Sequence, residues 1–507
     1  MKRINYKLTV ILSLLFIFLA TSHITGFNLI SSFVNFPSSF YWATSNLVPN
    51  YASMSFAPII FNQLIETILL AISVTTTASI FAFILAIMCA NSLLNNTFLR
   101  FLVKIFSGIL RNIPDAVLAI ILMFSFGANI ISGFLALFIG TVGILAKAFT
   151  EIIEETSKSQ IEAVYASGCS TFVLVFRVVL PNTIKDMLSW VLFSIETNVR
   201  AATIVGILTG TGIGFLFDIF YRRLDYGSAG LVVLFIIAAV VFIELINEQI
   251  RTKLLNYKNN KVLIFVVIAL FLISVLSFFT FDFPGINLSQ SLSSKLSNFG
   301  IMFFGPALFN TDLGSILNSL LITLALGILS TILGFVIAFI ITFFCVYSKT
   351  LRVLSKVIIS IFRAVPAILW VLMFTISMGL GASAAVIGLT IHSAAFLVKT
   401  FTESIEENRN TENLESVGAS FTSIFFQNIV PNNIRNFTMW TFLRLEINFT
   451  NAVIIGAVAG ASGIGYNLFL ASNFHFNLRE VGFITYLILI TCSFLEFISF
   501  FIKKIIK

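Results

Sequence analysis

Charged and amide side chains interrupt two otherwise apolar segments, one in each half of the chain. The first segment holds Glu196, Asn198 and Arg200, and the second holds Glu446 and Asn448. Glu196 and Arg200 stand four residues apart, so on a helix they share one face and partly neutralise each other. A lone charge at the centre of a bilayer costs at least about 2.5–3.5 kcal/mol, so such side chains face a bundle interior or a wet pathway. We predict that these five residues line a solute pathway, the alternative being that they pin neighbouring helices and touch no solute.

The two segments differ in their cations. Thr450 stands where the second copy of Arg200 would fall, and Arg444 lies two residues before Glu446. The predicted pathway is therefore asymmetric.

Two polar segments, again one in each half, share a second pattern. In each, a glutamate precedes a glycine by six residues, and a proline follows that glycine by thirteen. This order indicates a short helix, a turn and the first turn of another helix. The segments are either local caps and turns or a docking surface for another protein, and their repetition favours docking. We call each segment a handle. The residues are Glu162, Ala163, Gly168 and Pro181 in the first segment and Glu412, Gly418 and Pro431 in the second.

The composition places the chain in a membrane. Of its 507 residues, 58% are hydrophobic and 10% are charged, which leaves too little polar surface to cover a soluble particle. Apolar runs of about 20 residues, the length that a helix needs to cross the hydrocarbon, recur throughout. They are solidly apolar rather than alternating, which argues against a β-barrel. The formal charge of +8 does not indicate a nucleic-acid partner, because the basic residues gather beside the ends of the apolar runs.

These runs predict about 12 transmembrane helices, six in each half. Lys and Arg are absent from 25–62 and cluster at the next connection, at the midpoint and at the end, so both termini are predicted to be cytoplasmic. The first run follows basic residues as a secretory signal does, but without a good cleavage site we expect it to be retained. The predicted spans are 8–25, 62–90, 101–126, 129–150, 184–208 and 230–249, then 261–281, 314–345, 357–378, 383–400, 434–458 and 481–502.

The two halves are copies of each other. Adding 252 carries Arg111, Pro114 and Lys147 onto the same residue types, and after a two-residue contraction the shift of 250 does so for Trp190 and Glu196. Since each copy has an even number of spans, both have the same orientation, related by a pseudo-twofold axis along the membrane normal. The fold class is therefore an all-α membrane protein of two parallel six-helix repeats. The predicted domains are 1–255 and 256–507, with a basic linker near the boundary.

Motifs of enzymes and of metal sites are missing from the sequence. No lysine follows a glycine, so a Walker A loop is absent, and the four cysteines show no CxxC spacing. Glycine sets at 206–214 and 456–465 suit a close approach of helices or a broken helix end at the outer mouth. We predict a chain that is not an enzyme and that holds no metal or cofactor of its own.

The paired polar segments resemble the EAA loop by which permease subunits of binding-protein-dependent ABC importers dock on their ATPase partners. The second copy departs from that motif, since Asn413 and Leu414 replace its two alanines. The string Glu196-x-Asn198-x-Arg200, with the Arg111-x-x-Pro114 motif, is similar to phosphonate ABC importer permeases. The likeness covers nearly all of both halves, as if two family members were fused.

This resemblance implies a type I permease fold in a bacterial inner membrane. It implies two ATP-binding cassette ATPase subunits as partners, with ATP and Mg held there, and an extracytoplasmic substrate-binding protein. The implied cargo is a phosphonate or a related small phosphorus oxyanion, carried into the cytoplasm. The sequence leaves open which phosphorus compound is carried, whether the two halves suffice, and whether Arg200 touches the cargo.

Two other classes are compatible with the composition. A proton- or ion-coupled secondary transporter can have parallel repeats, and a buried glutamate such as Glu196 or Glu446 could carry protons in it. That class leaves the paired polar segments unexplained. A membrane-embedded enzyme is less favoured, because no metal-ligand spacing or catalytic cluster stands out.

Overall fold

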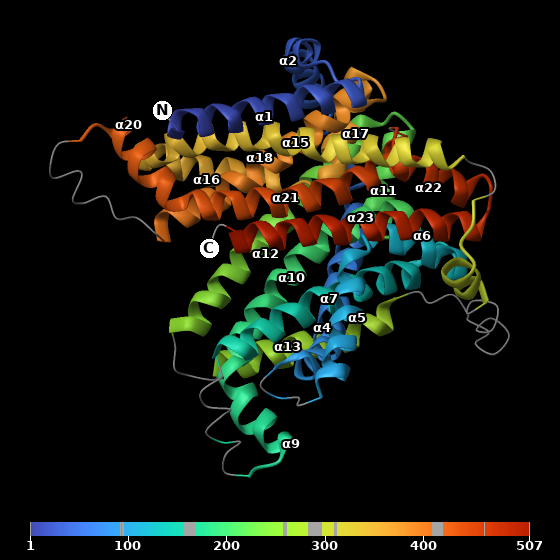
Figure 1. The fold of residues 1–507 in the computed structure, drawn as a ribbon. Coiled ribbons are helices and arrows are strands. Elements are labelled where there is room, and N and C mark those ends of the chain that lie inside the picture. The colour runs from blue at the N-terminus through green and yellow to red at the C-terminus, as the bar shows by residue number, and fades with distance from the viewer. Residues whose placement is uncertain are drawn as a thin grey trace. The chain divides into compact units, whose positions relative to one another are not determined.

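A computed structural model shows that the chain is helical (Figure 1). The structure describes residues 2–91, 93, 96–156, 164, 168–256, 261–281, 297–308, 312–407, 419–460 and 462–505, and no strand occurs among them. Over these residues, nine helices are long and apolar enough to cross a membrane, or up to 12 spans if each of three bent helix pairs counts as one. The predicted all-α membrane fold is confirmed.

The chain forms two compact units whose boundaries differ from those of the two sequence repeats. The middle unit is Leu47–Gly300, and the split unit joins Met1–Asn46 to Ile301–Lys507. Helix α1 (Lys2–Thr25) packs along α15 (Leu313–Tyr347), and α13 (Lys261–Thr280) packs on α4 (Ala57–Cys89) (Figure 1). Each repeat thus contributes its first helix to the unit built by the other repeat. The predicted domains at 1–255 and 256–507 describe the order of the sequence and stay a prediction.

The middle unit is centred on α7 (Ile130–Thr156), which packs against four neighbouring helices, α4, α5, α6 and α10. Its helices after α4 and up to α13 are α5 (Thr97–Asn112), α6 (Asp115–Phe126), α7, α9 (Thr171–Leu174), the π-helix η1 (Val175–Val179), α10 (Leu180–Thr209), α11 (Gly212–Arg222) and α12 (Tyr226–Asn256), and the short α3 (Tyr51–Met54) precedes α4.

The split unit repeats this arrangement around α18 (Ala382–Glu407), which packs against α15, α16, α17 and α21. It also contains α2 (Leu29–Asn46), which packs on α17 and which lies outside the predicted spans. Its other helices are α16 (Lys349–Ala364), α17 (Ala367–Met378), α20 (Phe421–Ile424), the π-helix η2 (Phe425–Ile429), α21 (Val430–Ala459), α22 (Ile464–Asn473) and α23 (Leu478–Ile505).

The predicted spans at 101–126 and 357–378 are not single straight helices. Each is a helix pair, with a bend of 91° between α5 and α6 and of 82° between α16 and α17. The bends fall at Pro114 and Pro366, because a proline holds the residue before it in an extended conformation. Each second helix has 12 residues, about 18 Å, and is too short to cross the hydrocarbon alone.

Helices α5 and α16 have the composition of helices that lie along a membrane interface. Both are amphipathic, carry basic residues and no acidic ones, and expose large apolar side chains such as Phe101 and Val357. The amphipathic pattern is hard to recognise in the sequence because apolar residues dominate both stretches and an apolar helix follows directly.

Glycines allow two helix crossings that match between the repeats. At Gly214 of α11 and at Gly465 of α22, an added Cβ would overlap the backbone carbonyl oxygens of Thr203 and Val453, respectively. Just before each crossing, α10 and α21 end at glycines in the left-handed conformation, Gly210 at φ 71° and Gly460 at φ 65°. The glycine sets therefore provide both a helix end and a close approach.

We expect Gly214→Ala to lower the unfolding midpoint of the purified protein, because the crossing of α10 and α11 must open to admit the methyl group. Overpacking of this kind costs about 1–3 kcal/mol or more. Gly108→Ala in α5 is the matched control, since no atom lies within 4 Å of its added Cβ and alanine favours a helix. Equal midpoints for the two variants would contradict this account of the crossing.

Candidate functional site

The first predicted handle is described only in part. Glu162 and Ala163 lie outside the described residues, as do Glu412 and Gly418 in the second handle. Gly168 is exposed and has a φ of 78°, and no atom lies within 4 Å of an added Cβ. The backbone conformation, rather than a close contact, therefore requires glycine at this position.

The predicted prolines lie inside continuous helical stretches rather than at free helix starts. Residues Thr171–Thr209 and Phe421–Ala459 each form one such stretch, and Pro181 and Pro431 each follow a turn of π-helix, η1 or η2. The amide of Leu180 bonds to the carbonyl of Val175, five residues back, and Val430 repeats this. A proline lacks the amide hydrogen and its ring crowds the carbonyl four residues back, so a wider turn accommodates it without ending the helix.

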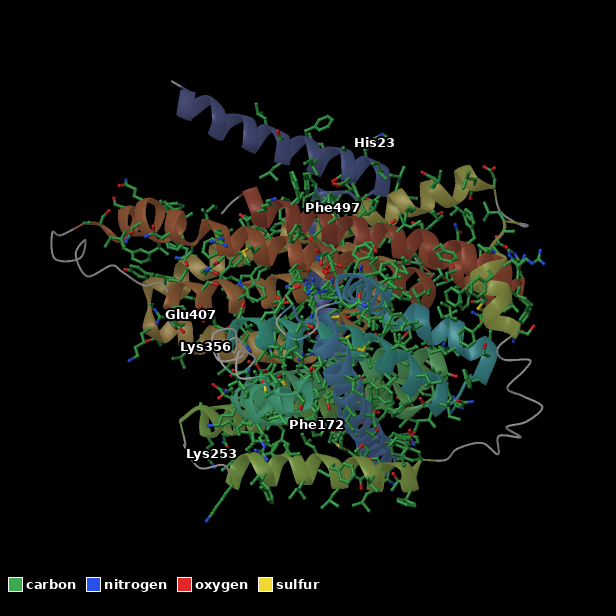
Figure 2. The ribbon with its side chains drawn as sticks, turned by 60° about the horizontal axis from the view of Figure 1, so that its bottom comes forward. His23, Phe172, Lys253, Lys356, Glu407 and Phe497 are labelled. Atoms are coloured by element: carbon green, nitrogen blue, oxygen red, sulfur yellow. The ribbon has the colours of Figure 1, made fainter. Side chains whose placement is uncertain are left out.

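Ion pairs join the interfacial helices to the helices that lead into the two handles. In the middle unit, Lys104 of α5 lies 3.9 Å from Glu154 near the end of α7. In the split unit, Arg352 and Lys356 of α16 lie 3.3 and 3.6 Å from Glu406 of α18, and Figure 2 shows Lys356 beside the end of α18 at Glu407. Lys104 and Glu154 correspond to Lys356 and Glu406 under the shift of 252, so the same connection occurs in both repeats.

The predicted pathway residues of the first repeat are buried between three helices of the middle unit. The side-chain amide of Asn198 donates hydrogen bonds to Thr75 of α4 and Thr141 of α7, at 2.8 and 2.9 Å. Arg200 Nη2 lies 3.1 Å from Glu196 Oε1, and the Glu196 side chain is 4% exposed. The paired charges and the used amide hydrogens agree with the helix-pinning alternative. Whether a solute also touches these side chains stays a prediction.

The second repeat builds the same polar cluster in the split unit. Asn448 donates from its amide nitrogen to Thr331 of α15 and Ser393 of α18, both at 2.9 Å. Thr331 and Ser393 occupy the places that Thr75 and Thr141 hold in the first cluster. Glu446 accepts a short hydrogen bond from Ser499 of α23. The structure thus places Glu446 and Asn448 on one helix, with partners from three others.

Arg444 belongs to this second cluster, although the sequence analysis did not select it. Its Nε donates to Ser393 Oγ at 3.0 Å, its guanidinium lies 5.5 Å from the centre of the Phe396 ring, and the residue is 1% exposed. The available signal was an arginine within an apolar helix at the position that Ser194 holds in the first repeat. Because the repeats do not share this position, the matched residues alone do not assign Arg444 to the predicted pathway.

Two stretches of the chain, residues 82–283 and 330–507, match the model of one protein family, the binding-protein-dependent transport system inner membrane component. The chain belongs to this family and contains its domain twice. It is a transport permease of the ABC-importer class, and a multi-pass protein of the inner membrane.

Known relatives carry names of phosphorus-compound permeases. The chain is 25% identical over 424 residues to the phosphate-import permease protein PhnE of Mycolicibacterium smegmatis, covering 80% of this chain and 78% of that protein. It is 27% identical to the phosphite transport system permease protein PtxC of Stutzerimonas stutzeri over 37% of this chain and 68% of that one. It is 30% identical to a putative cryptic phosphonate transport system permease protein, PhnE2 of Escherichia coli, over 23% of this chain and 96% of that one.

We expect Arg200→Met to destabilise the protein more than the double change Glu196→Gln with Arg200→Met. The single change leaves a buried carboxylate without its guanidinium, at a cost of about 3–5 kcal/mol, whereas the double change removes both charges. Unfolding midpoints of the purified variants test this, with Glu196→Gln alone completing the cycle. A double variant as unstable as Arg200→Met would show that the ion pair does not hold α10 in place.

Proposed function

We propose that this permease carries a phosphonate or a related small phosphorus oxyanion into the cytoplasm, driven by two partner ATPase subunits. An extracytoplasmic substrate-binding protein delivers the anion to the outer mouth. ATP and Mg are bound and consumed in the partner subunits, and this chain holds neither. The observation that carries the proposal is the occurrence of two family domains in one chain, each with a handle of the same spacing.

The names of the relatives support a phosphorus oxyanion as cargo. Phosphate, phosphite and phosphonate are small tetrahedral oxyanions, and the relatives that are named for them match this chain over one or both repeats. An arginine is well suited to such a ligand because its planar guanidinium pairs with two oxygens at once. Cationic side chains within the spans, Arg200 and Arg444, are compatible with that cargo.

Two handles of the same spacing suit a pair of ATPase subunits, each of which has one docking site. A pair of ATPase subunits closes and opens as ATP is bound and hydrolysed, and each subunit would grip one handle at Glu162–Pro181 or Glu412–Pro431. Each handle continues through a π-helical turn into α10 or α21, the helices that carry Glu196 and Glu446. Movement at a handle is thereby transmitted along one helix to the predicted pathway.

In this arrangement both handles and both termini face the cytoplasm. The basic residues of α5 and α16, which pair with the ends of α7 and α18, lie on the same side as the handles. A secondary transporter is less favoured, because membership of a binding-protein-dependent transport family and the repeated handle both point to an external energy source.

We expect the double variant Gly168→Leu and Gly418→Leu to uncouple ATP hydrolysis by the partner subunits from uptake of the anion. Leucine at Gly168 must adopt a positive φ, which reshapes the handle without entering the bundle. The coupling of ATP hydrolysis to anion transport should fall roughly 5- to 150-fold. It is measured in liposomes as the amount of anion taken up per ATP hydrolysed.

The matched control is Gly127→Leu with Gly379→Leu. These glycines also have positive φ, 82° and 81°, but they end α6 and α17 instead of lying in a handle. Unchanged coupling in the handle variant, or an equal loss in the control, would refute the docking role.

A further inference from the structure

Arg444 is a cation in the interior of the split unit, and it has no acidic partner among the residues that the structure describes. Among the residues that the structure describes, its contacts are the hydrogen bond from Nε to Ser393 and the ring of Phe396. Its Nη2 is buried and has no acceptor there. Arg200 in the other repeat differs, because it is paired with Glu196 at 3.1 Å.

The polar cluster of the first repeat shows that the arginine is not needed to join these helices. There, Asn198 joins Thr75 and Thr141 in the way that Asn448 joins Thr331 and Ser393. Ser194 occupies the place of Arg444 and brings no charge. The amide and hydroxyl groups therefore form the same connection between three helices with or without a cation, and the cation in the second repeat needs another explanation.

The neighbouring carboxylate does not provide that explanation. Among the residues that the structure describes, Glu446 accepts a hydrogen bond from the hydroxyl of Ser499 on α23, whereas Arg444 donates to Ser393. An arginine that is 1% exposed, within a helix that is long and apolar enough to span a membrane, is unfavourable unless a counter-charge reaches it. Its remaining hydrogens can form two parallel bonds with a tetrahedral oxyanion, and the hydroxyl of Ser393 lies beside it as a further polar group.

We propose that Arg444 is the residue that contacts the phosphorus oxyanion in transit, with Ser393 positioning its guanidinium through Nε. The inference rests on the proposed function and names the group that recognises the cargo within the membrane. Arg444 is buried in this structure, and α21, which carries it, is the helix that continues from the second handle. Movement of that handle would expose the guanidinium to the arriving anion.

The contacts of the two arginines assign one anion-binding guanidinium to the chain, that of Arg444, rather than two. In the first repeat the arginine is neutralised by Glu196, and the position equivalent to Arg444 is a serine. The two repeats therefore have different roles within the bilayer although their handles match. One anion per chain is the stoichiometry that this asymmetry requires.

The test uses the purified chain without ATPase or receptor, so that its outcome is independent of the proposed coupling. Unfolding midpoints are measured with methylphosphonate, phosphite or inorganic phosphate, against sodium gluconate at equal ionic strength. We expect at least one of the three anions to raise the midpoint of the wild type. Arg444→Met should raise the midpoint of the ligand-free protein, because it removes an uncompensated buried charge, and should abolish the rise caused by the anion.

Arg435→Met is the matched control, since Arg435 lies on the same helix but is exposed. It lowers the total charge equally and should leave the effect of the anion intact. In cells, Arg444→Met should reduce uptake roughly 30-fold or more, and Arg444→Lys, which keeps the charge without the planar fork, should reduce it less.

Three results would overturn the inference while leaving the ABC-permease function standing. They are no anion effect in the wild type, an equal effect in Arg444→Met, and a fall in the ligand-free midpoint of Arg444→Met with normal uptake. If the Arg444→Met variant does not accumulate in cells, the unfolding midpoints of the Arg444→Lys variant with and without the anion are measured instead. A weaker anion effect at an unchanged ligand-free midpoint supports the inference, and an unchanged anion effect refutes it.

Discussion

In the hydrocarbon of a membrane, a polar group must find its partner within the protein, because no water can replace that partner. This constraint accounts for much of the architecture of the chain. The amides of Asn198 and Asn448 each bind hydroxyls on two neighbouring helices, and Glu196 is paired with Arg200. The prolines of the two handles are accommodated by π-helical turns instead of leaving a broken helix. Arg444 is a buried charged side chain with one nitrogen that has no acceptor among the described residues, and it is the group that we assign to the cargo.

Duplication explains why the same contacts between helices occur in both repeats. Thr67 and Thr323 each accept a hydrogen bond from the start of the short helix that follows a left-handed glycine, at 2.9 Å in both cases. The exchange of α1 and α13 between the two compact units makes each repeat depend on the other for its outer packing. Within the polar cluster, the exchange of Ser194 for Arg444 alters the charge without disturbing the shared amide and hydroxyl contacts.

Periodicity and composition predicted nine of the twelve spans where the described residues form a single spanning helix, because long apolar runs have few alternatives in a membrane. They failed at Pro114 and Pro366, where an amphipathic helix turns sharply into a short apolar one, and at α2, which begins after a glycine and contains Pro37. The site was harder to predict. Spacing selected Asn198 and Asn448, but their hydroxyl partners are distant in sequence. Arg444 was noted as a difference between the repeats but was not assigned to the pathway, because only one repeat has it.

The central claim is that one duplicated chain presents two handles to a pair of ATPase subunits. Native mass spectrometry of the complex, purified through this chain, tests it most directly because the number of each subunit is read from the mass. The account predicts one copy of this chain with two ATPase subunits. A complex with a single ATPase subunit, or one that needs a second copy of this chain to hold two, would contradict it.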